Sequence, residues 1–146
     1  MKRAADFFSS EQKDTIVKAI EKAELNTSGE IRLHVELNCK TDAFDRAVAV
    51  FNMLNMHKTE LRNGVLFYIA INDRKFAIIG DSGINNLVSN DFWDSTKELM
   101  LQYFKQGEVV QGIVEGIIKA GEQLKHYFPY STNDVNELSN DISFEN

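Results

Sequence analysis

The sequence predicts an α/β protein, built as a three-layer α/β/α sandwich around a small mixed, mostly parallel sheet. A strand pattern over residues 30–37, a helical pattern over 42–58 and a buried strand over 65–71 follow one another as a βαβ unit. A polar turn at 72–75 and an apolar run at 76–79 then form a hairpin with the buried strand. Amphipathic helices before and after these strands supply the outer layers.

Length and composition indicate one domain. The chain has 146 residues, which suits a single hydrophobic core. We place the domain at residues 1–128. Residues 129–146 are polar, acidic and aperiodic, so we expect a disordered tail there.

Each element before the hairpin has its own signal. Ser9 and Gln12 form a capping box for a helix that starts near Glu11 and ends at a turn before Gly29. The strand over residues 30–37 alternates polar residues with the apolar residues Ile31, Leu33, Val35 and Leu37. The next helix repeats its apolar residues at helical spacing: Phe44, Ala47, Val48, Phe51 and Leu54.

The second half of the chain continues the pattern. The uninterrupted apolar run at 65–71 indicates a central strand that is covered on both faces. Residues 84–88 are expected to form a loop or a short helical turn, and helices are expected over 91–106 and 108–128. Pro129 ends the last helix.

Charge and targeting signals narrow the function classes. The net charge of −6 disfavours nucleic acid, because phosphate binding needs a basic surface. The first residues lack the apolar segment of a signal peptide, and no apolar stretch approaches the roughly 20 residues of a membrane span. The single cysteine, Cys39, excludes an internal disulfide and a thiolate metal cluster. We expect a soluble, cytoplasmic monomer whose partner, if it has one, is a protein.

One edge of the predicted sheet gathers oxygen donors. Glu30 begins the first strand, Asn63 precedes the second, Asp81 follows the third, and Asp91 opens the next helix. Because the third strand runs back along the second, these four residues are expected at the same edge. A hard cation such as Ca²⁺ takes six to eight oxygen ligands. A purely structural interpretation has equal weight. In it, Glu30 is a solvent-facing strand residue, Asp81 is a turn residue and Asp91 caps a helix.

The opposite edge provides a weaker alternative site. Asp73 and Arg74 lie in the hairpin turn, where they could contact a cation and a phosphate respectively. A purely structural turn is favoured over this site, because Asn and Asp accept the backbone angles of a turn.

Several catalytic motifs are absent from the sequence. The C-x₅-R spacing of cysteine phosphatases fails, because Asp45 stands where arginine is needed. G-x-S-x-G fails at Ile84, and there is no H-E-x-x-H or phosphate-binding Gly-Lys loop. The histidines His34, His57 and His126 stand alone and are interpreted as structural.

The three hairpin segments together resemble the core of the TPM domain family. They are the strand run from Asn63 to Ala70, the turn from Asn72 to Lys75 and the loop from Gly80 to Ile84; Glu30 and Ile31 fit the family's first strand. The resemblance covers roughly residues 8–128. It implies the α/β/α fold, and it implies calcium binding, which has been associated with the domain.

The resemblance also widens the functional alternatives. Relatives include proteins linked to photosystem II repair, receptor modulators and a plant member described as an acid phosphatase. Many bacterial relatives carry a signal peptide and a membrane anchor, and this sequence shows neither.

Three hypotheses follow for the function. The first is a cation-binding interaction module without established catalysis, with Ca²⁺ as the expected ion and Mg²⁺ as the alternative. The second is a metal-assisted acid phosphatase that acts on phosphate monoesters, with Arg74 as an anion contact. The third is an adaptor that binds a protein partner without any ion.

Overall fold

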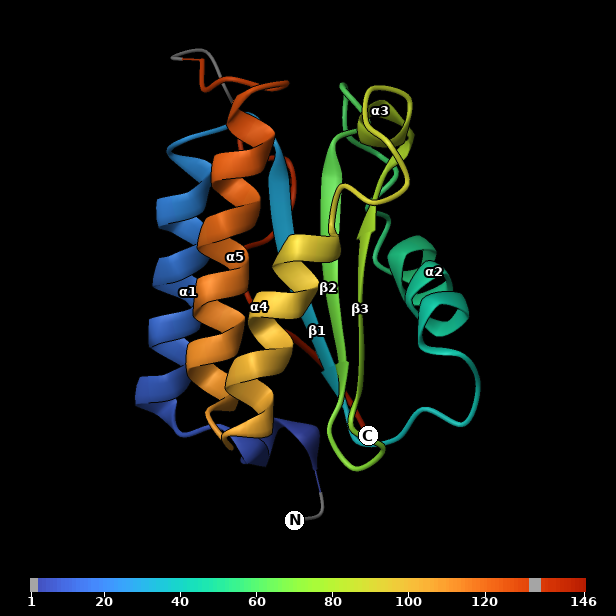
Figure 1. The fold of residues 1–146 in the computed structure, drawn as a ribbon, viewed down its shortest axis with the longest axis vertical. Helices are drawn as coiled ribbons and strands as arrows, with labels where there is room; N and C mark the ends of the chain where they lie inside the picture. The colour runs from blue at the N-terminus through green and yellow to red at the C-terminus, as the bar shows by residue number, and fades with distance from the viewer. Residues whose placement is uncertain (1–2, 132–134) are drawn as a thin grey trace.

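The computed structural model describes residues 3–131 and 135–146 and has the predicted three layers. A four-stranded sheet in the order β3-β2-β1-β4 lies between helices on its two faces (Figure 1). Strand β1 (Glu30–Glu36) pairs in parallel with β2 (Gly64–Ala70), and β2 pairs in antiparallel with β3 (Lys75–Gly80). The predicted βαβ unit and hairpin are therefore confirmed.

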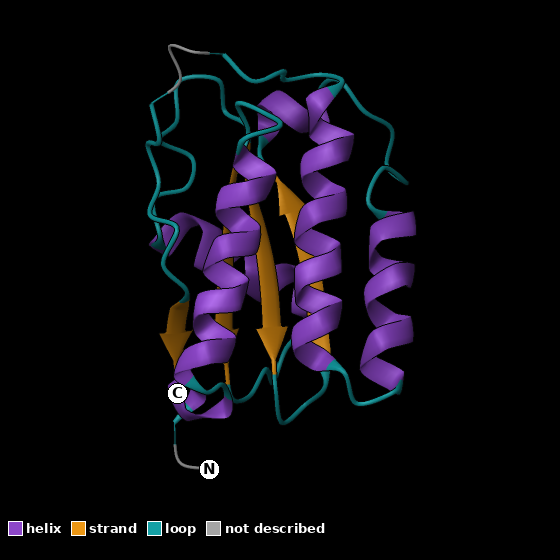
Figure 2. Ribbon diagram, turned by 90° about the vertical axis from the view of Figure 1, so that its left-hand side faces the viewer, coloured by secondary structure: helices purple, strands orange, loops and turns teal. Residues whose placement is uncertain are grey.

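The alternation of side chains along the strands separates two cores. Ile31, Leu33 and Val35 of β1 face α1 (Ser10–Glu24), α4 (Asp94–Lys105) and α5 (Val109–Lys125). The opposite face of β2 and β3 packs against α2 (Ala43–Met53). Every residue of β2 is buried, as expected for a strand with helices on both sides. Figure 2 shows three long helices side by side in front of the strands.

The C-terminal segment differs from the disorder expected for residues 129–146. Ser143–Glu145 form a short strand, β4, which pairs in parallel with β1 on the side away from β2. Ile142 and Phe144 pack against the core, and Pro129 forms a bridge with Thr27. The segment is ordered here because it covers an otherwise open strand edge and buries apolar side chains. Residues 132–134 of the predicted tail lie outside the described residues.

Three of the predicted helices extend beyond the observed ones. Helix α2 ends at Met53 instead of residue 58, and Asn55 then takes a left-handed φ of 57°. Helix α4 begins at Asp94 instead of Asp91, and α5 ends at Lys125 instead of residue 128. Two short helices complete the fold: the 3-10 helix η1 (Ala4–Phe7) and α3 (Ser82–Asn85).

The helices of residues 3–131 and 135–146 differ from a membrane-spanning helix in their length and hydropathy. None of them is long and apolar enough to cross a bilayer.

Candidate cation site at the amino edge of the sheet

Three of the four predicted cation ligands lie at what we call the amino edge, where β1 and β2 begin and β3 ends. The N–H of Glu30 donates to the carbonyl of Asn63 at 3.3 Å, and the N–H of Asp81 donates to the carbonyl of Gly64 at 2.9 Å. All three predicted ligands are buried. The strand topology therefore brings Glu30, Asn63 and Asp81 to one edge, as the sequence predicts.

Asp91 lies apart from this edge. It is exposed in the loop before α4, and its carboxylate accepts a hydrogen bond from the hydroxyl of Ser89 at 2.5 Å. Among the described residues, no hydrogen bond or ion pair joins Asp91 to the other three predicted ligands. The later start of α4, at Asp94, leaves Asp91 in a loop instead of at a helix terminus.

The charge of Asp81 is already neutralised by the protein. Arg62 donates two hydrogen bonds to its carboxylate, from Nε at 2.8 Å and from Nη2 at 2.9 Å. The N–H of Ser82 donates a third at 2.7 Å and thereby caps α3. The side chain of Arg62 is 48% exposed, whereas that of Asp81 is 5% exposed. A cation could use Asp81 only after Arg62 had turned toward solvent.

Asn63 ties the start of β2 to its neighbours. Its N–H donates to the hydroxyl of Thr59, and its side-chain amide donates to the carbonyl of Ser28, both at 3.3 Å. These bonds give Asn63 a structural role at the edge.

Glu30 and Glu24 are carboxyl groups whose pKa values are raised. The carboxylate of Glu30 accepts the N–H of Leu138 at 2.7 Å; burial raises its pKa to about 7, and the nearby charge of Glu137 adds to the rise. Glu24, the last residue of α1, accepts the N–H of Ile31 at 2.9 Å. Burial raises the pKa of Glu24 to about 7 as well, and the charge of Glu30 contributes.

We call Glu24, Glu30 and Glu137 the amino-edge carboxylates. Within the described part of the chain, no lysine or arginine forms an ion pair with any of them. Oxygen donors from three separate segments, without a protein cation, are the ligand chemistry that Ca²⁺ accepts. Sequence reasoning found Glu30 and missed the other two, because Glu24 looks like a solvent-facing helix residue and Glu137 lies in the aperiodic tail.

Asp73 and Arg74, the weaker alternative site, have side chains that lie in different places. The carboxylate of Asp73 accepts the N–H of Cys39 at 2.5 Å and ties the hairpin turn to the end of β1. Arg74 takes a left-handed φ of 53° and lines an apolar cavity instead. The two side chains do not meet in one site.

A second polar cluster lies beneath α2 and the C-terminal segment. The carboxylate of Glu36 accepts hydrogen bonds from His34 Nε2 at 2.9 Å, from Arg46 Nε at 2.9 Å and Nη2 at 3.0 Å, and from the hydroxyl of Tyr68. Arg46 also pairs with Glu145. Burial alone would raise the pKa of Glu36, but the bonds from Arg46, Tyr68 and His34 outweigh it and lower the pKa to about 2.

This second cluster is a poor cation site despite its ligand types. His34, Glu36 and Glu145 offer atoms that lie within 4.8 Å of one another. However, the oxygens of Glu36 accept four hydrogen bonds, which matches the roughly four lone-pair positions of a carboxylate. Burial lowers the pKa of His34, whose Nδ1 accepts from the hydroxyl of Ser143 at 2.9 Å while its Nε2 donates to Glu36. The cluster is saturated by the chain itself and fixes β4 to β1.

Comparison with known proteins gives one family and several similar structures. The family model described as the TPM domain matches residues 1–123. The BA42 protein of the psychrophilic bacterium Bizionia argentinensis, solved by NMR, shares 50% sequence identity with a TM-score of 0.90; the match covers 98% of this chain and 99% of that chain. It therefore includes most of the C-terminal segment, which lies beyond the family model.

Two more distant structures share the fold. The N-terminal domain of a P. gingivalis protein has 14% identity and a TM-score of 0.69, over 85% of this chain and 80% of that chain. An N-terminal domain from Corynebacterium glutamicum has 14% identity and a TM-score of 0.62, over 88% and 78%. No curated protein matches the sequence.

Proposed function

This chain belongs to the TPM domain family, and we propose that it is a calcium-binding interaction module whose ion binds at the amino edge of the sheet. The observation that supports the proposal is electrostatic: the charge of Glu30 acts on Glu24, that of Glu137 acts on Glu30, and no described lysine or arginine forms an ion pair with any of the three. Glu30 is the central ligand of the proposed site, because its charge interacts with both of the others.

Electrostatics favours a divalent ion at this place. A carboxyl group with a pKa of about 7 is half protonated at neutral pH, because the buried charge has too little compensation. A bound cation supplies the missing positive charge and displaces the protons. Calcium suits three separate segments better than magnesium, because Mg²⁺ demands near-ideal octahedral geometry, whereas Ca²⁺ accepts irregular ligand sets.

The interaction part of the proposal follows from the position of the ion. Glu137 and the Leu138 N–H belong to the C-terminal segment, and both lie against Glu30 of the sheet. An ion shared by these residues fixes the segment to β1, so the surface offered to a protein partner depends on calcium.

The other three predicted ligands, Asp81, Asn63 and Asp91, are not primary ligands of the proposed ion. Asp81 joins the ion only if Arg62 releases it. Asn63 supports the edge through its own hydrogen bonds. Asp91 lies outside the proposed site.

The phosphatase alternative receives less support from the geometry. It needs an anion contact close to the metal, and Arg74 was the expected residue. Arg74 precedes β3 and the amino edge follows it, and the six residues of β3 span about 20 Å at ~3.3 Å per residue. The proposed ion and Arg74 therefore act at opposite ends of the sheet.

A thermal-melt series at pH 8 tests the proposal. Calcium should raise the melting temperature of the wild-type protein, because a ligand that binds the folded state at about 100 times its Kd stabilises by ~2.7 kcal/mol. Glu30→Gln should abolish this rise, although glutamine keeps an oxygen to accept the Leu138 N–H. Asp91→Asn is the matched control and should respond to calcium as the wild type does. A wild-type melting curve that calcium leaves unchanged would rule out the site.

A further inference from the structure

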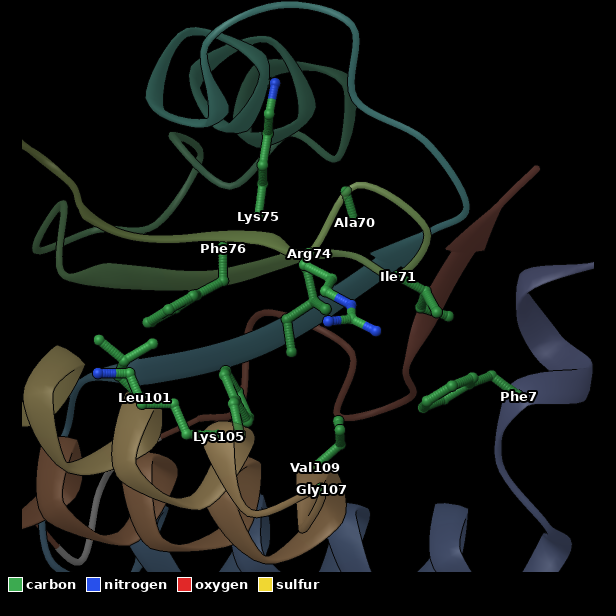
Figure 3. A pocket seen from close by; sticks show the side chains of 12 residues that line it. Phe7, Ala70, Ile71, Arg74, Lys75, Phe76, Leu101, Lys105, Gly107 and Val109 are labelled. Atoms are coloured by element: carbon green, nitrogen blue, oxygen red, sulfur yellow. The ribbon is translucent and has the colours of Figure 1, made fainter.

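An open apolar cavity lies between the β2–β3 hairpin and the helices α4 and α5, away from both polar clusters. Its volume is about 590 Å³, within the range of roughly 300–1,000 Å³ that is typical of small-molecule sites. Its lining includes the buried residues Ile69 and Ala70 and six partly exposed apolar side chains: Phe7, Ile71, Phe76, Leu101, Phe104 and Val109. In Figure 3, Ile71 and Phe76 come from the hairpin, Leu101 from α4, Val109 from the start of α5 and Phe7 from η1.

The charged side chains at the cavity are all basic. Arg74, Lys75 and Lys105 line it, and none of the lining residues is acidic. This is notable in a chain with 22 acidic and 16 basic residues. The Lys75 Nζ is occupied, since it donates to the carbonyls of Cys39 at 3.0 Å and Thr41 at 2.9 Å.

Arg74 differs from the ion-paired arginines of the described residues. Arg3, Arg46 and Arg62 each pair with a carboxylate. Within residues 3–131 and 135–146, the guanidinium of Arg74 has no hydrogen bond or ion pair, and neither has the ammonium of Lys105. In Figure 3, Arg74 is directed from the hairpin toward the helices, whereas Lys75 points the opposite way. A positive group is thus held at an apolar cavity without a partner from the chain.

We propose that this cavity binds a single straight-chain alkyl carboxylate. The hydrocarbon chain lies among Phe76, Phe104 and Leu101, and the carboxylate accepts two parallel hydrogen bonds from Arg74, with Lys105 adding a second positive charge. The body of the ligand should be apolar, because the side chains of the wall are apolar apart from its three cations. A peptide, sugar or nucleotide would leave its own polar groups unpaired there.

An NMR titration of the full ¹⁵N-labelled chain with dodecanoate, below its micelle concentration, tests this inference. We expect saturable amide shifts in the hairpin, at the end of α4 and at the start of α5. Dodecyltrimethylammonium has the same chain with the opposite charge, and butyrate has the same head group with a short chain; neither should reproduce these shifts. Equal binding of the cationic amphiphile, or no shift with dodecanoate, would overturn the proposal.

Two single-residue variants test whether the positive charge of Arg74 is needed for binding. Arg74→Gln should weaken dodecanoate binding about tenfold or more, as expected for the loss of a charge-assisted bond. Lys125→Gln makes the same charge change on an exposed residue away from the cavity and should leave binding unchanged. Binding that survives Arg74→Gln at full strength would contradict the proposed role of the guanidinium.

A third variant acts from α5. Val109→Glu places a carboxylate at the first residue of α5, where negative charge favours the helix, so the fold should be retained. The new charge should repel dodecanoate and abolish binding. If the amides at the cavity shift with protein concentration before any ligand is added, a second copy of the chain covers the cavity, and the proposal is wrong.

Discussion

Glu36 shows how a single buried charge is stabilised. Its two oxygens accept bonds from His34, Arg46 and Tyr68, and its side chain is 4% exposed. The pKa is about 2 in the folded protein against 4.5 for the free group. Glu36 therefore contributes stability that is fully present above pH 4.5 and is lost as the pH falls toward 2.

We predict that Glu36→Gln destabilises the protein at pH 7 by about 3 kcal/mol, because Arg46 loses its buried partner. The difference from wild type should shrink as the pH is lowered from 4.5 toward about 2, because the stabilising charge of the wild-type carboxylate is then progressively lost. Urea unfolding at several pH values measures both effects. Glu11→Gln, on the exposed side of α1, is the control. A difference that is independent of pH would contradict the assignment of the charge.

Arg74 combines an unfavourable backbone with an unpaired side chain. A left-handed residue other than glycine costs about 1–2 kcal/mol, and the flexibility of glycine in the unfolded chain returns roughly half of that. Arg74→Gly should therefore stabilise the folded protein by about 0.5–1 kcal/mol while it weakens dodecanoate binding.

The converse substitution provides the matched comparison. Gly107 has a φ of 77°, and an added Cβ would meet nothing within 4 Å. Gly107→Ala should destabilise by about 1 kcal/mol through backbone conformation alone. Urea unfolding measures both variants. A loss of stability in Arg74→Gly would mean that packing of the arginine outweighs its backbone strain.

At the scale of elements, the C-terminal segment covers the polar face of β1. Leu138 donates to Glu30, Ser143 bonds to His34, and Glu145 reaches Arg46 beside Glu36. Strand β4 also pairs with the edge of β1 that β2 leaves free. Two polar residues of β1, Glu30 and His34, thus bond directly to the far end of the chain.

We predict that a chain ending at residue 131 melts at a lower temperature and associates with itself. The truncation removes the hydrogen bonds that the C-terminal segment makes to Glu30 and His34. It also exposes the edge of β1, which favours pairing with a second copy of the chain. Thermal melts and size-exclusion chromatography measure the two effects. An unchanged melting temperature in a monomeric truncated chain would show that β4 contributes nothing to the fold.

The elements were predictable where the signal was local and periodic. The alternation after Gly29 and the uninterrupted run to Ile71 predicted β1 and β2, because each strand carries its own pattern. The three residues of β4 are too few for a pattern, and their stability comes from distant partners. The same limit applies to the site: strand topology found Glu30, whereas Glu24 and Glu137 approach it only through the packing of α1 and the tail.

For the whole molecule, the two groups of carboxylates set opposite pH responses. The pKa values of Glu24 and Glu30 are raised from 4.5 to about 7. Their contribution to stability is present below pH 4.5 and is lost as the pH rises to about 7, the reverse of the Glu36 response. The calcium-free protein should therefore lose stability between pH 4.5 and 7 from this edge.

We predict that calcium prevents the loss of folding stability between pH 4.5 and 7. In the calcium-free protein, Glu30→Gln should make this loss smaller. Calcium binding at neutral pH should also release protons, because the ligand carboxyls must be ionised. Calorimetric titrations in buffers with different ionisation enthalpies measure the released protons. Binding without proton release at about pH 6.5, just below the raised pKa values of about 7, would place the ion away from Glu24 and Glu30.

An NMR titration of the full chain with calcium at pH 8 tests the amino-edge site most directly. Calcium bound at this edge should cause saturable amide shifts centred on Glu24, Glu30, Ile31, Glu137 and Leu138, with the carboxyl end of β1 unaffected. Shifts centred instead on Asn38, Glu36 and Glu145, or no saturable shift at all, would contradict a calcium site at the amino edge.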